Sequence, residues 1–425
     1  MLRLSVRACR PTLHRIPSSS VAGTLEEISV HDLGNRDLHA VCFPESAREQ
    51  VEAYWRHTGE IVSSRLAQVV LGEAAVTDST ADAKSTIRRR VAEWTGSRAE
   101  DVFLLPTGMA AIFLAYRLFQ NRCLERRSVQ FGFPYVDTLK IQQRFSRLNA
   151  SAGEPVLFYP IGDERELTEL TERLATENVL GIFCEIPSNP LLRSPDIQAL
   201  RELTQQRRVP LLIDDTLGAI TNLRMLPLAD VLVTSLTKYF SGVGDVMGGA
   251  LILNTSSPFY SELREILATE FEDLLFDADA LVLERNSRDC PERMQRINHN
   301  AETLAEFLAD HPAVSRVYYP KYETVENYHA FRLPGAGYGG LLSFEVIDPA
   351  TNAPAVFDAL RVAKGPNLGT NYTLSCPYTI LAHYQELEFV ERCGVSRYLI
   401  RVSVGMEPTE EIVSRFAEAL DHAQT

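Results

Sequence analysis

A single lysine lies between two apolar runs in the middle of the chain, and its surroundings favour amine chemistry. Lys238 follows the run 229–235 and precedes a glycine-rich segment, 241–249, that leads into the run 246–253. These runs predict two neighbouring buried strands. Burial lowers the pKa of an amine and leaves more of it neutral and nucleophilic, so Lys238 could form a Schiff base. The local pattern fits equally well a lysine that ends a strand and reaches solvent.

Other polar residues follow apolar runs in the same way. A strand-like run at 102–105 breaks at Thr107-Gly108, and strong helix formers come next. The free N–H groups and the positive dipole end of a helix N-terminus could hold a phosphate here, although a threonine N-cap without a ligand gives the same pattern. Further polar residues at such positions are Tyr135, Asn189 and Asp214.

Short apolar runs alternate with helical patterns from about residue 85 to residue 253. This order predicts an α/β fold with a mainly parallel sheet that helices cover on both faces. Ligands bind beyond the carboxyl ends of the strands in such sheets, so we expect the polar residues above to meet at one edge. A smaller unit follows, with strands expected at 314–319, 340–346 and 399–404 and helices at 355–363 and 409–423.

The organisation of the chain therefore has three predicted regions. We expect an N-terminal extension and arm over 1–60, a large domain over 61–290 and a small domain over 291–425. The 425 residues are 45% hydrophobic and 23% charged, which is ordinary for a globular protein. The net charge of −14 argues against nucleic acid as a partner, and no apolar run approaches the ~20 residues that span a bilayer. We therefore expect small-molecule partners and no membrane association.

The cysteines and histidines give no sign of a metal site. The 7 cysteines form no C-x-x-C pair, and their odd number favours free thiols in a reducing compartment such as the cytoplasm. The 9 histidines show no ligand spacing with one another or with the cysteines. The first 24 residues carry arginines and serines but no acidic residue, which is typical of a mitochondrial or other organellar transit peptide and equally compatible with a short basic extension.

Five motifs follow one another along the chain: Thr107-Gly108-Met109-Ala110-Ala111, Glu185-x-Pro187-x-Asn189-Pro190, Asp214-x-Thr216, Ser235-x-Thr237-Lys238-Tyr239 and Arg401-x-Ser403-x-Gly405-x-Glu407. In this order they resemble the Cys/Met-metabolism family of pyridoxal-phosphate enzymes, from about residue 50 to the C-terminus. The stretches 364–370 and 376–384 are similar to the fungal cystathionine γ-synthase branch. The resemblance implies fold type I, which has a large, mainly parallel seven-stranded sheet domain that binds pyridoxal 5′-phosphate and a smaller C-terminal α+β domain.

The resemblance also implies a role for each motif residue. Lys238 would carry the cofactor and then move protons on the substrate, and Asp214 would pair with the pyridinium nitrogen and so maintain the electron sink. Tyr135 would stack on the ring and take part in catalysis, unless it only packs at a strand end. Asn189 would bind the phenolic oxygen and lie near the substrate, although turn chemistry alone also explains an asparagine before proline. The phosphate contacts implied are Gly108, Met109, Ser235 and Thr237.

On the substrate side the resemblance assigns Arg401 to the α-carboxylate, which suits a planar bidentate fork, while a surface salt bridge is the alternative. Tyr54 and Arg56 resemble a Tyr-x-Arg pair that reaches the cofactor phosphate of a neighbouring subunit, which implies a homodimer or homotetramer with shared active sites. The departures lie near the substrate. Tyr372-Thr373-Leu374 stands where the family has Glu-Ser-Leu, so Thr373 is expected to help choose the substrate.

The function implied is γ-replacement on an O-acyl-L-homoserine with cysteine as the nucleophile. Sulfide or a carbon enolate could replace cysteine after the same first half-reaction. Cystathionine or methionine lyase chemistry is a further alternative, disfavoured by the stretches similar to the fungal branch. A non-catalytic homologue is disfavoured by the presence of Lys238, Asp214 and Arg401.

Overall fold

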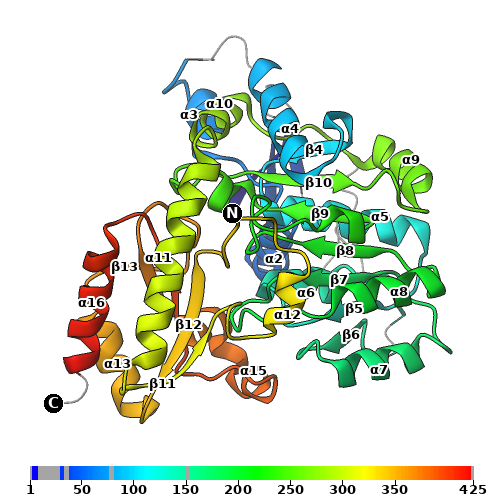
Figure 1. Ribbon diagram of the computed structural model, residues 1–425. Helices are drawn as coiled ribbons and strands as arrows, with labels where there is room; N and C mark the ends of the chain where they lie inside the picture. Colours follow the sequence, from blue (N-terminus) through cyan, green and yellow to red (C-terminus); the bar gives the residue numbers. More distant parts are fainter. Residues whose placement is uncertain are drawn as a thin grey trace.

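The computed structural model describes residues 2–7, 29–32, 38–75, 81–149, 151 and 153–422 (Figure 1). A small antiparallel sheet comes first, in which β3 (Leu38–Phe43) lies between β1 (Leu2–Arg7) and β2 (Ser29–Asp32). The sequence did not predict these strands, because their pairing joins segments that are distant along the chain. Of the basic segment compared with a transit peptide, residues 1 and 8–24 lie outside the described residues.

The large domain contains a seven-stranded sheet in the order β4-β10-β9-β8-β7-β5-β6. Strand β10 is antiparallel to both of its neighbours, and the remaining pairs are parallel. The mainly parallel sheet is therefore confirmed, as is the pairing of the strands on either side of Lys238. The strands are β4 (Val102–Leu105), β5 (Ser128–Phe131), β6 (Val156–Tyr159), β7 (Ile182–Glu185), β8 (Leu211–Asp214), β9 (Val231–Thr234) and β10 (Gly249–Leu253).

Alternate side chains of this sheet enter two different cores, as the two-residue period of a strand requires. In β8, Leu212 belongs to one core, whereas Leu211 and Ile213 belong to the other. The first core is covered by α5 (Gly108–Arg122), α6 (Val136–Arg144) and α9 (Tyr260–Glu270). The second is covered by α4 (Ala81–Thr95), α7 (Glu164–Arg173) and α8 (Ile197–Arg207). Both faces are thus buried, which leaves the strand ends as the place for polar chemistry.

The smaller domain follows the long helix α11 (Cys290–Asp310), which packs along the sheet of that domain (Figure 1). Its sheet has the order β11-β12-β15-β14-β13, antiparallel except for the β13–β14 pair. Helices α13 (Pro349–Ala359) and α16 (Thr409–His422) cover it. The expected helix at 355–363 was placed too late, because α13 begins at Pro349, whose fixed φ suits a first turn. The strands are β11 (Val314–Tyr318), β12 (Leu341–Val346), β13 (Ala363–Lys364), β14 (Leu374–Pro377) and β15 (Ile400–Ser403).

Short helices connect these parts. They are α2 (Arg48–Thr58), α3 (Ser64–Val70), α10 (Asp277–Asn286), α12 (Val325–His329), α14 (Tyr378–His383), α15 (Leu387–Arg392) and the π-helical turn η6 (Leu236–Phe240). The predicted α/β fold with a large and a smaller domain is confirmed, and the boundaries at residues 60 and 290 stay predictions. Across the described part of the chain, no helix combines the length and apolar character needed to cross a membrane.

Candidate active site

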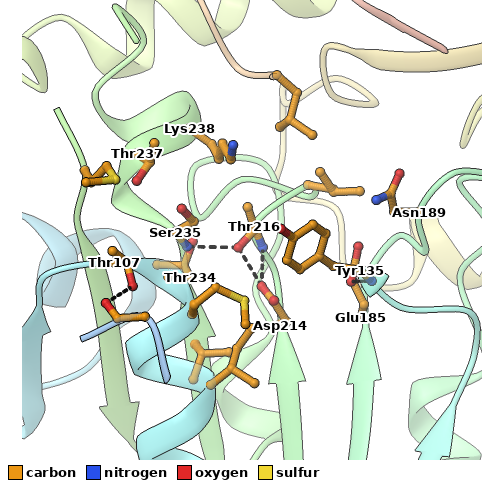
Figure 2. A pocket seen from close by; sticks show the side chains of 18 of the residues that line it. Thr107, Tyr135, Glu185, Asn189, Asp214, Thr216, Thr234, Ser235, Thr237 and Lys238 are labelled. Atoms are coloured by element: carbon orange, nitrogen blue, oxygen red, sulfur yellow. Dashed lines mark hydrogen bonds between the residues drawn. The ribbon is translucent and has the colours of Figure 1, made fainter. Parts of the chain in front are cut away.

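A cavity of about 450 Å³ lies at the carboxyl ends of the central strands, where the sequence places its polar residues. Figure 2 shows the side chains converging from β8, β9 and the turns that follow them. Of the predicted site residues, the structure brings to this cavity Arg56, Gly108, Met109, Tyr135, Asn189, Asp214, Ser235, Thr237, Lys238 and Arg401. Residues from helices, strand ends and loops more than 300 positions apart therefore share one space.

The N-terminus of α5 forms one end of the cavity. Thr107 is its N-cap, and its Oγ1 accepts a hydrogen bond from the Ala110 N–H at 3.0 Å. The same hydroxyl donates to the carbonyl oxygen of Gly59 at 2.8 Å. A Cβ added to Gly108 would lie 2.7 Å from Ser235 Cβ, so only glycine fits this close approach. The first N–H groups of α5 thus remain accessible beside a serine and form an anion cradle.

Asp214, at the end of β8, is buried and held by its neighbours. Its Oδ1 accepts hydrogen bonds from the backbone N–H of Thr216 at 3.0 Å and from the Thr216 hydroxyl at 2.6 Å. The Thr216 hydroxyl in turn accepts from the Ser235 N–H at 2.9 Å, so strands β8 and β9 are joined at their ends (Figure 2). Burial raises the pKa of Asp214, and the two bonds from Thr216 oppose that rise.

Lys238 lies inside η6, where its backbone departs from helical geometry at φ −83° and ψ −126°. Its Nζ donates to Asn367 Oδ1 at 2.8 Å. Burial, followed by the positive charge of Arg401, lowers the pKa of Lys238 to about 8. The amine therefore has a neutral, nucleophilic fraction near neutral pH that an exposed lysine lacks.

A charged cluster surrounds the hydroxyl of Tyr135. This hydroxyl donates to Asp137 Oδ2 at 3.0 Å, and Arg56 contacts both carboxylate oxygens of Asp137 at 3.0 and 3.2 Å. Burial disfavours the charged form of Asp137, but His57 and Arg56 outweigh it and lower the pKa of Asp137. Burial of the phenol, and then Asp137, raise the pKa of Tyr135. The phenol consequently donates a hydrogen bond to a carboxylate and stays protonated at neutral pH.

Arg401, on β15 of the smaller domain, lines the cavity from the side of that domain. Its Nη1 donates to Asn189 Oδ1 at 3.0 Å and its Nη2 donates to the Pro366 carbonyl oxygen at 2.5 Å. A guanidinium has five N–H donors, so these two bonds leave donors for a ligand. The arginine is buried in the site and is not a surface salt bridge, the alternative that the sequence left open.

Two predicted residues do not reach the cavity. Tyr54 is buried with its ring 5.7 Å from that of Phe145. It is two positions before Arg56 on α2, and two residues on a helix point to roughly opposite sides. Thr373 is buried too, and its Oγ1 donates to Glu407 Oε2 at 2.9 Å and accepts from the Gly405 N–H at 3.0 Å. Thr373 therefore braces a loop of the small domain and does not line this cavity.

Three residues of the site had no predicted role. Glu185 accepts from the Tyr135 N–H at 2.6 Å, and burial, followed by the charge of Asp214, raises its pKa. The motif around Asn189 contained this glutamate and could have signalled it. Asn367 lies in the stretch similar to the fungal branch, but its contact with Lys238 spans 129 positions. Asp137 could have been noticed as an acidic residue two positions after Tyr135.

Comparisons with known proteins agree with this geometry. The family model for Cys/Met metabolism PLP-dependent enzymes matches residues 79–421. Cystathionine gamma-synthase of Neurospora crassa is 46% identical over 334 residues, which are 77% of this chain and 53% of that protein. The match thus spans about half of that relative. The cystathionine gamma-synthase-like enzyme iboG1 of Amanita muscaria is 35% identical, covering 93% of this chain and 79% of its own length.

Solved structures extend the likeness to the fold. Cystathionine gamma synthase of Xanthomonas oryzae, in complex with cystathionine, superposes with a TM-score of 0.69 at 23% identity, and the match covers 83% of this chain and 89% of that one. Cystathionine gamma-lyase of Lactobacillus plantarum gives the same TM-score of 0.69. At this level of identity the structures establish fold type I, as the sequence predicted.

The residues of the cavity fit pyridoxal 5′-phosphate. A neutral amine at Lys238 suits its aldehyde, a buried carboxylate at Asp214 suits its ring nitrogen, and the start of α5 suits its phosphate. The space that a Cβ on Gly108 would fill belongs to the same cradle. The chain therefore belongs to the Cys/Met metabolism family of enzymes that depend on pyridoxal 5′-phosphate.

Proposed function

We propose that this enzyme catalyses γ-replacement on an O-acyl-L-homoserine, with cysteine as the nucleophile and cystathionine as the product. The observation that carries the proposal is the placement of Lys238, Asp214 and Arg401 around one cavity of about 450 Å³. The relatives named cystathionine gamma-synthase support the same reaction. In this proposal the cavity holds both the cofactor and an amino acid.

When bound, the cofactor supplies an electron sink for the carbon from which a proton is removed. Asp214 keeps a proton on the ring nitrogen, and Arg401 binds the α-carboxylate of the amino acid through its remaining donors. The Nζ of Lys238 removes the proton from Cα and then one from Cβ, which its lowered pKa permits near neutral pH. The chain's own residues thus place the substrate and move its protons.

The replacement itself exchanges two groups at Cγ. The Cγ–O bond breaks and the acyloxy group leaves as a carboxylate, while the sulfur of cysteine bonds to the same carbon. Lys238 returns protons to Cβ and Cα, and the proton of the thiol is released to solvent. Atoms and electrons balance without an external oxidant or reductant.

The remaining cradle residues are proposed to hold the cofactor. The N–H groups of Gly108 and Met109 and the hydroxyls of Ser235 and Thr237 bind the phosphate, and Asn189 binds the phenolic oxygen. The ring of Tyr135 stacks on the cofactor. Because the hydroxyl of Tyr135 donates to Asp137, we assign this residue positioning rather than proton removal.

Arg56 is proposed to reach the cofactor phosphate of a neighbouring subunit in a homodimer or homotetramer. Within one chain its guanidinium pairs with Asp137 while its side chain is 60% exposed, so donors remain for a phosphate of the neighbouring subunit. Tyr54 would accompany it only by leaving its buried place against Phe145. The free thiols of the described cysteines support the cytoplasm as the compartment that we propose.

Product analysis tests the reaction. The purified holoenzyme is incubated with O-acetyl- or O-succinyl-L-homoserine and cysteine, and the products are identified by mass spectrometry. Cystathionine is the expected product. Formation of α-ketobutyrate without any replacement product would overturn the proposal in favour of a lyase. The absence of both products would overturn cysteine as the nucleophile, in favour of another nucleophile or a non-catalytic homologue.

A second candidate is γ-substitution with another nucleophile, such as sulfide or a carbon enolate. Tyr372 favours it, because this residue stands where the family has a glutamate and is 43% exposed. A Cβ on Gly244 would lie 3.7 Å from both the Tyr372 hydroxyl and the amide of Asn367, so the Tyr372 hydroxyl lies near a residue that lines the cavity. Including sulfide and a 1,3-dicarbonyl compound in the incubation distinguishes the two candidates.

A further inference from the structure

An aromatic ring lies against the guanidinium of Arg401. The Cζ atom of Arg401 is 4.6 Å from the centroid of the Tyr378 ring, within the range of a cation–π contact. Both residues are buried, at 4% exposure each. Such a contact is strengthened where water is excluded, because no solvent competes for the cation.

The hydroxyl of Tyr378 makes no comparable contribution. It is buried, and no hydrogen-bond partner for it lies among the residues that the structure describes. A buried hydroxyl without a partner is a cost, so the interaction that Tyr378 supplies is that of its ring. This distinction makes phenylalanine a matched substitution at the position, since it keeps the ring and removes only the hydroxyl.

The ring is held in place by its own element. Strand β14 pairs with β15 so that Cys376 lies opposite Arg401, and α14 begins two residues later at Tyr378. The Tyr378 N–H donates to the Leu399 carbonyl oxygen at 3.1 Å, which fixes the turn. The ring also contacts His383, with 5.7 Å between ring centroids.

We propose that Tyr378 is a positioning residue that supports Arg401 from one face and so fixes the plane in which Arg401 binds the substrate carboxylate. Asn189 and Pro366 hold two donors of the guanidinium, and the ring of Tyr378 prevents rotation out of the plane that these bonds define. The inference rests on the proposed role of Arg401 as the carboxylate clamp. A side chain that only filled the core would affect every ligand of the site alike.

Binding of two probes to the holoenzyme tests the proposal. L-homoserine carries the α-carboxylate, and 3-aminopropan-1-ol is the same chain without it. The change in visible absorbance of the cofactor gives the dissociation constant of each. We expect Tyr378→Leu to raise the dissociation constant of L-homoserine by about tenfold, because this ligand uses Arg401. The dissociation constant of 3-aminopropan-1-ol, which does not use Arg401, should change by no more than about twofold.

Matched variants complete the design. Tyr378→Phe should retain the affinity of the native enzyme for both probes. Tyr378→Met fills the space without a π face and replaces Tyr378→Leu in the test if the leucine variant folds poorly. It should show the same selective loss of affinity for L-homoserine. Equal losses for both probes, or no loss for L-homoserine, would overturn the inference. Arg401→Lys separates the role of Arg401 from the role of the Tyr378 ring. If this variant does not selectively lose affinity for L-homoserine, the assignment of Arg401 as the carboxylate clamp is wrong. If Arg401→Lys shows the selective loss and Tyr378→Leu does not, only the role of the ring is refuted.

Discussion

The two walls of the cavity are assembled in different ways. On the large-domain wall the contacts that hold Asp214 join nearby positions: Asp214 to Thr216 over 2 residues and Thr216 to Ser235 over 19. On the small-domain wall they join distant ones: Arg401 to Asn189 over 212 residues and Lys238 to Asn367 over 129. The first wall follows from the ends of one sheet, whereas the second exists only when two domains pack together.

This difference separates two tasks. The large-domain wall carries the groups that suit a cofactor, and the small-domain wall carries the groups that suit a substrate carboxylate. Substitutions in the first wall should therefore remove cofactor chemistry altogether, and substitutions in the second should change affinity, selectivity or pH dependence while the cofactor remains bound. The predictions below test that separation.

Lys238→Ala should have the largest effect, because Lys238 is the group that both walls share. In the proposed function its amine is the covalent anchor and the proton carrier, so we expect the proposed γ-replacement to fall by about 10⁴-fold or more. Product formation and the visible absorbance of the cofactor measure the two losses. Lys84→Ala, on α4, is the control and should retain activity. Substantial activity in Lys238→Ala would show that another group moves the protons.

Asp214→Asn should come next, with a loss of about 10²-fold in turnover, because the amide cannot hold the ring proton as a carboxylate does. Asp215 provides a matched control. It is a neighbouring carboxyl that is also buried, with its pKa raised by burial and then by Asp214, but it does not line the cavity. Asp215→Asn should therefore keep most of the activity. Equal losses in the two variants would indicate damage to the fold in place of a chemical role.

Most of the large-domain wall could be predicted from the sequence. Asp214 and Lys238 follow recognisable strands, and parallel strands bring such positions to one edge whatever the details of packing. The Gly108 turn was predictable because a strand, a Thr-Gly pair and a run of helix formers stand in order. Glu185 was missed although its motif was recognised, because a glutamate at the end of a buried strand could face either side of the sheet.

The small-domain wall was harder to predict. Thr373 was expected to face the substrate, but its hydroxyl bonds to Glu407 and Gly405 in its own domain. Asn367 and Tyr378 lie in stretches that carried no periodic signal, and their roles depend on where the small domain places them against Lys238 and Arg401. Local patterns specify strands and caps, whereas these contacts arise from tertiary packing.

Gly108→Ala tests the cradle itself. The added Cβ would lie 2.7 Å from Ser235 Cβ, so the start of α5 must shift away from the end of β9. We expect about tenfold weaker cofactor affinity, measured by titrating the apoenzyme with pyridoxal 5′-phosphate. Gly365→Ala is the control, because no atom lies within 4 Å of the added Cβ. The affinity of this variant for pyridoxal 5′-phosphate should be unchanged. An unchanged affinity in Gly108→Ala would place the phosphate elsewhere.

Asn367→Leu should give the smallest effect, seen in pH dependence. Capture of pyridoxal 5′-phosphate by the apoenzyme requires the neutral amine of Lys238, so its rate should rise with pH through a midpoint at about 8, the pKa of that amine. The amide oxygen of Asn367 accepts a hydrogen bond from Nζ, which favours the charged ammonium. Removing this acceptor should move the midpoint of the pH profile below about 8, while the exposed Asn371, changed to leucine, should leave it in place. A midpoint that stays or rises would mean that the small-domain wall does not tune the lysine, and the two walls would then act independently even at Lys238.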